Sequence, residues 1–181
     1  SYHELLETLV VRDLKVRYKN SVLGFLWSLL NPLLLMIVFT VVFTFLLPNT
    51  STPRFPVFVL SALLPWTFFN TAVMGATNSI VQNGHLVKKV YFPRVILPLS
   101  AFVPASVDFL VSFLMFAMVM LFFGIVPGPQ ILLLPLVLAA TLVVSAAFAL
   151  WLSAVNGIYR DVQFAVPFVL QLGMMISPVV Y

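Results

Sequence analysis

A short basic stretch, residues 82–98 with the sequence QNGHLVKKVYFPRVILP, separates two long apolar runs. Within ten residues it holds four cationic or titratable side chains: His85, Lys88, Lys89 and Arg94. If the stretch is helical, Leu86, Val87 and Val90 lie on one side and the two lysines face water, which is typical of a short helix at a membrane surface. Such a helix could be displaced by a soluble partner that binds it. The alternative is a solvated loop that only carries positive charge.

The rest of the chain is poor in groups that do chemistry. His3 and His85 are the only histidines, and neither stands beside a set of carboxylates suited to metal binding or acid–base work. None of the seven glycines belongs to a G-x-x-x-x-G-K-[ST] phosphate loop, and there are no cysteines. We therefore expect no catalytic residue, no metal and no cofactor in this chain, and any energy must come from another subunit.

Asp108 is an acidic residue well inside an apolar run. A charge at that depth costs about 2.5 to 3.5 kcal/mol on insertion scales, so the side chain must face protein or water. Two roles are open: a structural hydrogen bond or a direct part in transport.

Composition identifies a membrane protein. The chain is 62% hydrophobic and 8% charged, with a mean hydropathy of +1.15. Its nine Lys and Arg residues lie in the gaps between apolar runs and not over one face, so the pI of 9.7 does not indicate nucleic-acid binding. The predicted fold class is all-α, a polytopic helical membrane protein with an N-terminal amphipathic interfacial helix and about five transmembrane helices.

Residues 1–181 are predicted to form a single transmembrane domain. Its elements are an interfacial helix at 1–20, spans at 23–47, 57–81, 95–123, 131–155 and 164–181, and a loop at 82–94. The third span exceeds the minimum length and contains Pro98 and Pro104, so we expect it to be tilted, kinked or broken. In the fourth span, small residues recur at four-residue spacing and predict a packing seam: Thr141, Ser145, Ala149 and Ser153.

The positions of the cations predict the orientation. Four lie in the N-terminal segment, three in the 82–94 loop and one at Arg160, all on the same predicted side, whereas Arg54 alone lies on the other. The positive-inside rule then places the N-terminus in the cytoplasm.

Two passages, Arg12–Met36 (RDLKVRYKNSVLGFLWSLLNPLLLM) and Asn83–Leu99 (NGHLVKKVYFPRVILPL), resemble the membrane subunit of type-2 ABC exporters. The resemblance is to the branch that exports lipid-linked polysaccharides such as O-antigen or teichoic acid. It implies a six-span permease of the bacterial cytoplasmic (inner) membrane, of which this chain, expected to be a fragment, supplies five spans. It also implies a homodimer with two ATP-binding-cassette ATPase subunits, which hold ATP and Mg²⁺, a polyprenyl-linked glycan as substrate, and contacts with membrane lipids but not nucleic acid. The permease itself would not be an enzyme.

The resemblance also implies roles for particular residues. Coupling to the ATPase would fall to Asn83, His85, Leu86, Lys88, Lys89, Tyr91, Phe92 and Arg94. The interfacial helix would contribute Arg12, Asp13 and Arg17; the last two, four residues apart, are also able to neutralise each other. Candidates for the channel lining are Phe25, Trp27, Trp66, Phe68 and Phe69, with core or interface-belt aromatics as the alternative.

Three other functions remain open at this point. Exporters of drugs or lipids share the same architecture. A proton- or ion-coupled secondary carrier would use Asp108 as its coupling site. A membrane scaffold without transport activity would use the basic loop only to recruit a partner.

Overall fold

The computed structural model describes residues 2–19, 26–46, 55–84, 93–125 and 128–177. Within these ranges the chain is helical, apart from short turns, and contains no strand. The helices are α1 (Tyr2–Lys19), α2 (Leu26–Leu46), α3 (Phe55–Gln82), α5 (Ile96–Phe122), the 3₁₀ helix η2 (Pro129–Leu133), α6 (Leu134–Ile158) and α7 (Val162–Ile176). The predicted fold class, a helical polytopic membrane protein, is confirmed.

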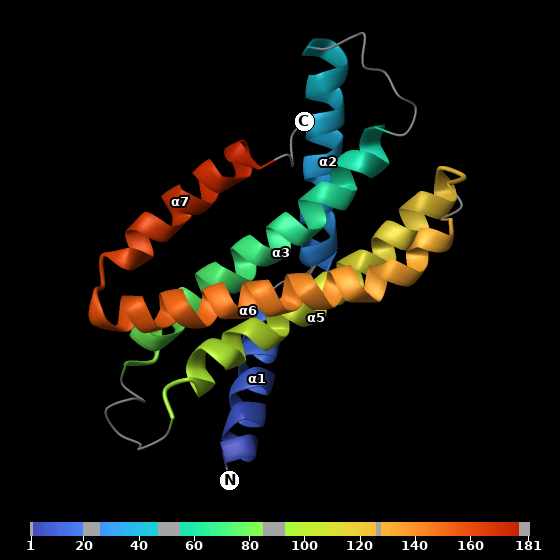
Figure 1. The fold of residues 1–181 in the computed structure, drawn as a ribbon. Helices are drawn as coiled ribbons and strands as arrows, with labels where there is room; N and C mark the ends of the chain where they lie inside the picture. Colours follow the sequence, from blue (N-terminus) through green and yellow to red (C-terminus); the bar gives the residue numbers. More distant parts are fainter. Residues whose placement is uncertain (1, 20–25, 47–54, 85–92, 126–127, 178–181) are drawn as a thin grey trace.

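Helix α3 is the centre of the bundle. It contacts α2, α5, α6 and α7, and Figure 1 shows it running between α5, α6 and α7. Its 28 residues continue through Pro65, although this proline removes one backbone donor from the helix. In a membrane such a break is tolerated where neighbouring helices enclose it, as they do here.

The seam between α3 and α5 is built from side chains at four-residue spacing. Leu60, Leu64 and Phe68 of α3 are buried against Ala105 and Phe109 of α5. The rings of Phe68 and Phe109 are stacked, with centroids 4.5 Å apart and planes inclined by 21°. Ridges at i, i+4 on both helices fit into each other's grooves, so the two helices pack as one unit.

Helix α5 is continuous despite its prolines. Pro98 lies in the first turn, where the backbone donors have no partner within the helix, while Pro104 lies further inside. The helix is 27 residues long, about 40 Å at 1.5 Å per residue, and exceeds a hydrocarbon core of ~30 Å. Of the expected outcomes, a break is therefore wrong, and the excess length favours tilt. Gly124, with φ of +66°, ends the helix in the left-handed conformation that glycine adopts without strain.

Helix α6 lies against α3 along the predicted small-residue seam. Ser145, Ala149 and Ser153 are buried, whereas Thr141 is half-buried. At Gly157 an added Cβ would stand 3.7 Å from the Ile80 side chain, so the two backbones also run close together there. The predicted seam is confirmed at its three central positions.

Three of the described helices are long and apolar enough to cross a membrane, namely α3, α5 and α6. Helices α2 and α7 occupy the predicted first and fifth spans. With 15 residues, α7 is shorter than the ~20 that a perpendicular crossing requires.

Figure 1 shows that the bundle has two distinct ends. Helix α1, the end of α3, the start of α5 and the turn between α6 and α7 lie toward one end. The start of α3 and the turn from α5 through η2 to α6 lie toward the other. Among the described residues, the cations belong to the first end, on α1, before α5 and in the α6–α7 turn.

Replacing Phe68 by alanine tests the α3–α5 seam. We expect Phe68→Ala to lower the free energy of unfolding by about 3 kcal/mol, because it leaves a cavity opposite Phe109. Phe58→Ala, on the same helix but 55% exposed, is the matched control and should change stability little. Melting of the purified protein in lipid nanodiscs measures both, and equal losses would contradict this packing.

Candidate functional site

The candidate site lies at the end of the bundle that carries the cations, and helix α1 forms its base. Leu9 is 5% exposed and packs with Ile96 and Leu97 at the start of α5, joined by the half-buried Leu6 and Ile80. On the far side of the helix Glu4, Glu7 and Lys15 are exposed, and Arg12 is exposed closer to the packed side. The amphipathic pattern thus seats α1 against the beginning of α5, with the Ile80 side chain of α3 packed at the edge of this contact.

Asn83 joins α1 to the point where α3 ends. The Arg12 guanidinium donates a hydrogen bond from Nη2 to Asn83 Oδ1 at 3.3 Å, across 71 residues of sequence. The amide Nδ2 and the backbone N–H of Asn83 both donate to the Ser79 carbonyl, at 2.9 and 3.1 Å. These bonds satisfy groups at the helix end and hold the start of the basic loop in place.

The chain re-enters helix α5 at Pro93 and Arg94. The backbone N–H of Ile96 donates to the Pro93 carbonyl at 3.1 Å, and that of Leu97 to the Arg94 carbonyl at 3.2 Å. Arg94 is exposed, whereas Ile96 and Leu97 are buried beneath α1. Both edges of the loop are therefore anchored beside α1.

The predicted coupling residues between these edges, His85, Leu86, Lys88, Lys89, Tyr91 and Phe92, lie outside the described residues. The same holds for the side chains of Asp13 and Arg17 on α1. Of the predicted set, the structure therefore brings together Arg12, Asn83 and Arg94 around one end of α3 and α5.

Asn156 forms a second junction, which sequence reasoning missed. Its side chain is fully buried and donates from Nδ2 to the Thr77 carbonyl of α3 at 2.7 Å. Its Oδ1 accepts the backbone N–H of Gln163 at 3.0 Å, in the first turn of α7, which has no side-chain cap from Asp161. One amide thus connects the ends of α3 and α6 to the start of α7. The only signal in the sequence is an asparagine before glycine at the end of an apolar run.

The hydroxyl groups of α3 do not make the interhelical bonds expected of polar residues in a membrane helix. Thr77 Oγ1 donates to the Val73 carbonyl at 2.7 Å, and Ser79 Oγ to the Ala76 carbonyl at 2.6 Å, both within α3. The interhelical bond uses the Thr77 backbone carbonyl instead. A hydroxyl that donates to a carbonyl of its own helix needs no acceptor on a neighbouring helix.

Of the aromatic candidates for a channel lining, Trp66 and Phe69 are in ring contact, with centroids 5.8 Å apart, whereas the other described candidates lie elsewhere. Trp27 is exposed on α2, and Phe25 lies outside the described residues. Phe68 faces α5, while Phe69 makes an edge contact with Phe148 of α6 at 5.6 Å. Trp66 is half-buried beside Gly173 of α7.

Asp108 is half-buried in α5 and has an interaction partner. This position is compatible with a structural role inside the bundle. Within the described ranges no group of three His, Asp or Glu residues is arranged to hold a metal ion.

Comparison with known proteins identifies the family. The ABC-2 type transporter family matches residues 4–181. The chain is 37% identical over 180 residues to the O-antigen export system permease protein RfbA of Myxococcus xanthus, a match that covers 99% of this chain and 69% of that protein. It is 29% identical over 179 residues to the protein of the same name from Klebsiella pneumoniae, covering 98% and 69%.

A more distant relative matches part of the chain. The polysialic acid transport protein KpsM of Escherichia coli is 28% identical over 78 residues, which covers 42% of this chain and 30% of that protein. The chain belongs to the ABC-2 type transporter family and is an integral membrane protein. The resemblance drawn from residues 12–36 and 83–99 is confirmed.

Replacing Asn156 by alanine tests the second junction. We expect Asn156→Ala to reduce the free energy of unfolding by about 2 kcal/mol and to speed hydrogen exchange at the start of α7, because Gln163 loses its acceptor. Asn31→Ala, at an exposed position of α2, is the control. Hydrogen exchange followed by mass spectrometry measures the effect, and unchanged exchange at Gln163 would refute the capping role.

Proposed function

We propose that this chain is the permease subunit of an ATP-driven exporter that moves a lipid-linked polysaccharide out across the cytoplasmic membrane. Support comes from the relatives, three of which are named for O-antigen export or polysialic acid transport. The similarity to the O-antigen permeases extends over nearly the whole chain and so includes both edges of the basic loop. Export of an O-antigen-like polymer on a polyprenyl carrier is the function that these observations favour.

In this proposal ATP is hydrolysed on a separate subunit. The chain has no phosphate loop, and transporters of this class couple a membrane part to ATP-binding-cassette proteins. Two copies of the permease would form the passage between them, and two ATPases would supply ATP and Mg²⁺ from the cytoplasm. The basic loop, residues 82–94, and helix α1 would face these ATPases.

One observation carries the coupling step: both edges of the basic loop are fastened to the same helix. Arg12 of α1 binds Asn83 at the start of the loop, and Leu9 of α1 packs on Ile96 and Leu97 just after it. A force applied to the loop is therefore delivered to α1, α3 and α5 together. This suits a mechanical coupling element better than a passive solvated loop.

The orientation follows from charge. Arg12, Lys15, Arg94 and Arg160 all belong to the end of the bundle that carries the basic loop. Under the positive-inside rule this end is cytoplasmic, and the N-terminus with it. The loop would then be on the side where ATP is available.

Complementation tests the cargo and the function together. In a strain that lacks its O-antigen permease, the full-length protein with its ATPase should restore polysaccharide at the cell surface, detected by antibody on intact cells. An ATPase variant that binds but does not hydrolyse ATP is the control and should leave the polymer inside. No surface polymer from an assembled, active complex would overturn the polysaccharide assignment.

A double-mutant cycle at Arg12 and Asn83 tests the coupling path. Arg12→Ala should slow export about threefold while ATP hydrolysis continues, since the hydrogen bond to Asn83, worth roughly 0.7 kcal/mol, is lost. Asn83→Ala should slow export somewhat more, because it also removes the side-chain bond to the Ser79 carbonyl. The double variant should be no slower than the slower single variant. Lys15→Ala, exposed on the same helix, is the control, and additive losses in the cycle would argue against a shared path.

Substitution of Asp108 separates this proposal from an ion-coupled carrier. We expect Asp108→Asn to retain ATP-dependent export that a protonophore does not inhibit. Its free energy of unfolding should fall by about 1 kcal/mol, because the contact of the Asp108 side chain is weakened. Transport and melting are measured on the same preparation. Loss of transport from fully folded protein, together with protonophore sensitivity in the wild type, would favour the carrier.

A further inference from the structure

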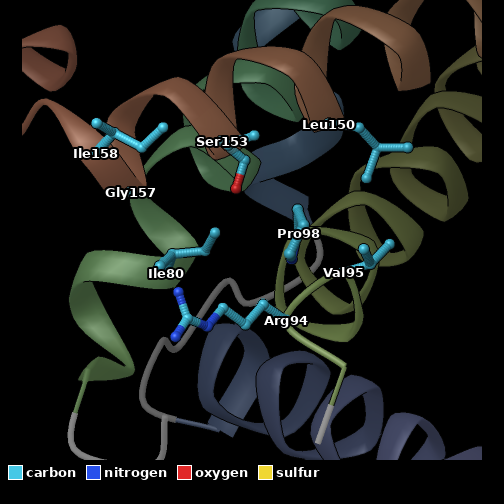
Figure 2. A pocket seen from close by; sticks show the side chains of 9 residues that line it. Ile80, Arg94, Val95, Pro98, Leu150, Ser153, Gly157 and Ile158 are labelled. Carbon is cyan, nitrogen blue, oxygen red and sulfur yellow. The ribbon is translucent and has the colours of Figure 1, made fainter.

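A pocket of about 350 Å³ lies between α3, α5 and α6 beside the exit from the basic loop (Figure 2). This volume is within the range of about 300–1,000 Å³ that is usual for small-molecule sites. Its walls are mainly apolar, and the described residues that line it are Ile80, Arg94, Val95, Pro98, Leu150, Ser153, Ala154, Gly157 and Ile158.

Two polar groups meet this apolar space. Ser153 is fully buried, its hydroxyl has no hydrogen-bond partner among the described residues, and Figure 2 shows it turned toward the space between Ile80 and Pro98. A buried hydroxyl without a partner is costly, so this position calls for an acceptor. Arg94 lies across the pocket from Ser153, with its guanidinium below Ile80, and it is the one cation among the described lining residues.

The rim of the pocket is apolar and exposed. Val95 and Ile158 border it and are 54% and 75% exposed, and both are apolar residues at the ends of helices long enough to cross a membrane. Water is a poor occupant of an apolar space that offers few polar partners. An occupant with one anionic end and a hydrocarbon body matches the single guanidinium, the buried hydroxyl and the apolar walls.

We propose that this pocket binds one anionic phospholipid of the adjacent leaflet. The lipid phosphate would accept hydrogen bonds from the Arg94 guanidinium, and one of its ester oxygens would accept a bond from Ser153. An acyl chain would lie along Ile80, Pro98 and Leu150. The lipid would thus connect Arg94, the last residue of the basic loop, to helix α6.

The charge balance favours this lipid over other phosphates. A phosphodiester carries one negative charge, which one guanidinium neutralises, whereas a diphosphate would bring more charge than Arg94 matches. A zwitterionic headgroup would need a carboxylate for its ammonium group, and the described lining residues include none. Free phosphate would leave the apolar walls uncovered. The inference concerns a bilayer lipid and does not depend on which cargo is exported.

Native mass spectrometry of the full-length protein, released from nanodiscs of phosphatidylglycerol in phosphatidylcholine, tests the site. We expect one tightly retained phosphatidylglycerol per chain. Arg94→Gln should weaken retention about tenfold and Ser153→Ala about threefold, the losses for a charged and a neutral hydrogen bond. Arg94→Lys should fall between the wild type and Arg94→Gln, because the charge stays but the planar donor fork is lost.

Two matched controls separate the pocket from general effects. Ser145 of α6 is also buried, and its hydroxyl likewise has no hydrogen-bond partner among the described residues. It does not line the pocket, so Ser145→Ala should retain lipid as the wild type does. Arg160→Gln removes an exposed cation at the same end of the bundle and so controls for a general loss of positive charge. Melting of every variant shows that it is folded.

Five outcomes would overturn the assignment. Equal lipid loss in Ser145→Ala and Ser153→Ala, or unchanged retention in Arg94→Gln, would exclude this pocket as the lipid site. Displacement of phosphatidylglycerol by equimolar polyprenyl diphosphate would assign the pocket to the cargo carrier instead. Displacement by inorganic phosphate or by diacylglycerol alone would show that only one half of the proposed ligand is recognised.

Discussion

The close approach of α6 to α3 is the constraint on which the described bundle depends. Apolar side chains gain nothing by leaving lipid for protein, so membrane helices associate through close packing and interhelical hydrogen bonds. Ser145, Ala149 and Ser153 are small enough to bring α6 against α3, and only at this short distance does the Asn156 side chain reach the Thr77 carbonyl at 2.7 Å. That contact in turn positions the Oδ1 atom that caps α7. A bulky residue in the seam would therefore disturb three helices, not one.

Much of the fold could be predicted from hydropathy and spacing. Spans near 57–81, 95–123 and 131–155 correspond to α3, α5 and α6. A long apolar run in a membrane forms a helix because a helix satisfies all its backbone hydrogen bonds within the segment. The packing seam on α6 could be predicted because small residues repeat at four-residue spacing, close to the helical period. The effect of Pro98 and Pro104 was harder to predict, since a break depends on packing against neighbouring helices, and α5 packs one face against α3 while remaining continuous.

The candidate site was predictable only in part, for a physical reason. Amphipathic spacing shows which side of α1 is apolar but not which helix it covers, so the contact of Leu9 with Ile96 and Leu97 needs the structure. The hydrogen bond between Arg12 and Asn83 joins residues 71 positions apart, and no periodic pattern in the sequence indicates it. Ring stacking likewise decides that Phe68 belongs to the α3–α5 seam, since Phe68 and Phe69 look equivalent in sequence but face different helices.

The arrangement of these contacts limits how the bundle can respond to a force. Helix α5 shares buried apolar contacts with both α1 and α3, and the Arg12–Asn83 bond links α1 to the residue that follows α3. Helix α7 is attached more lightly, through Val166 and Leu170 against Val73 and through the Asn156 cap. A displacement that begins at the basic loop therefore has two routes to α7, one directly from Val73 of α3 and one through the Asn156 side chain at the end of α6.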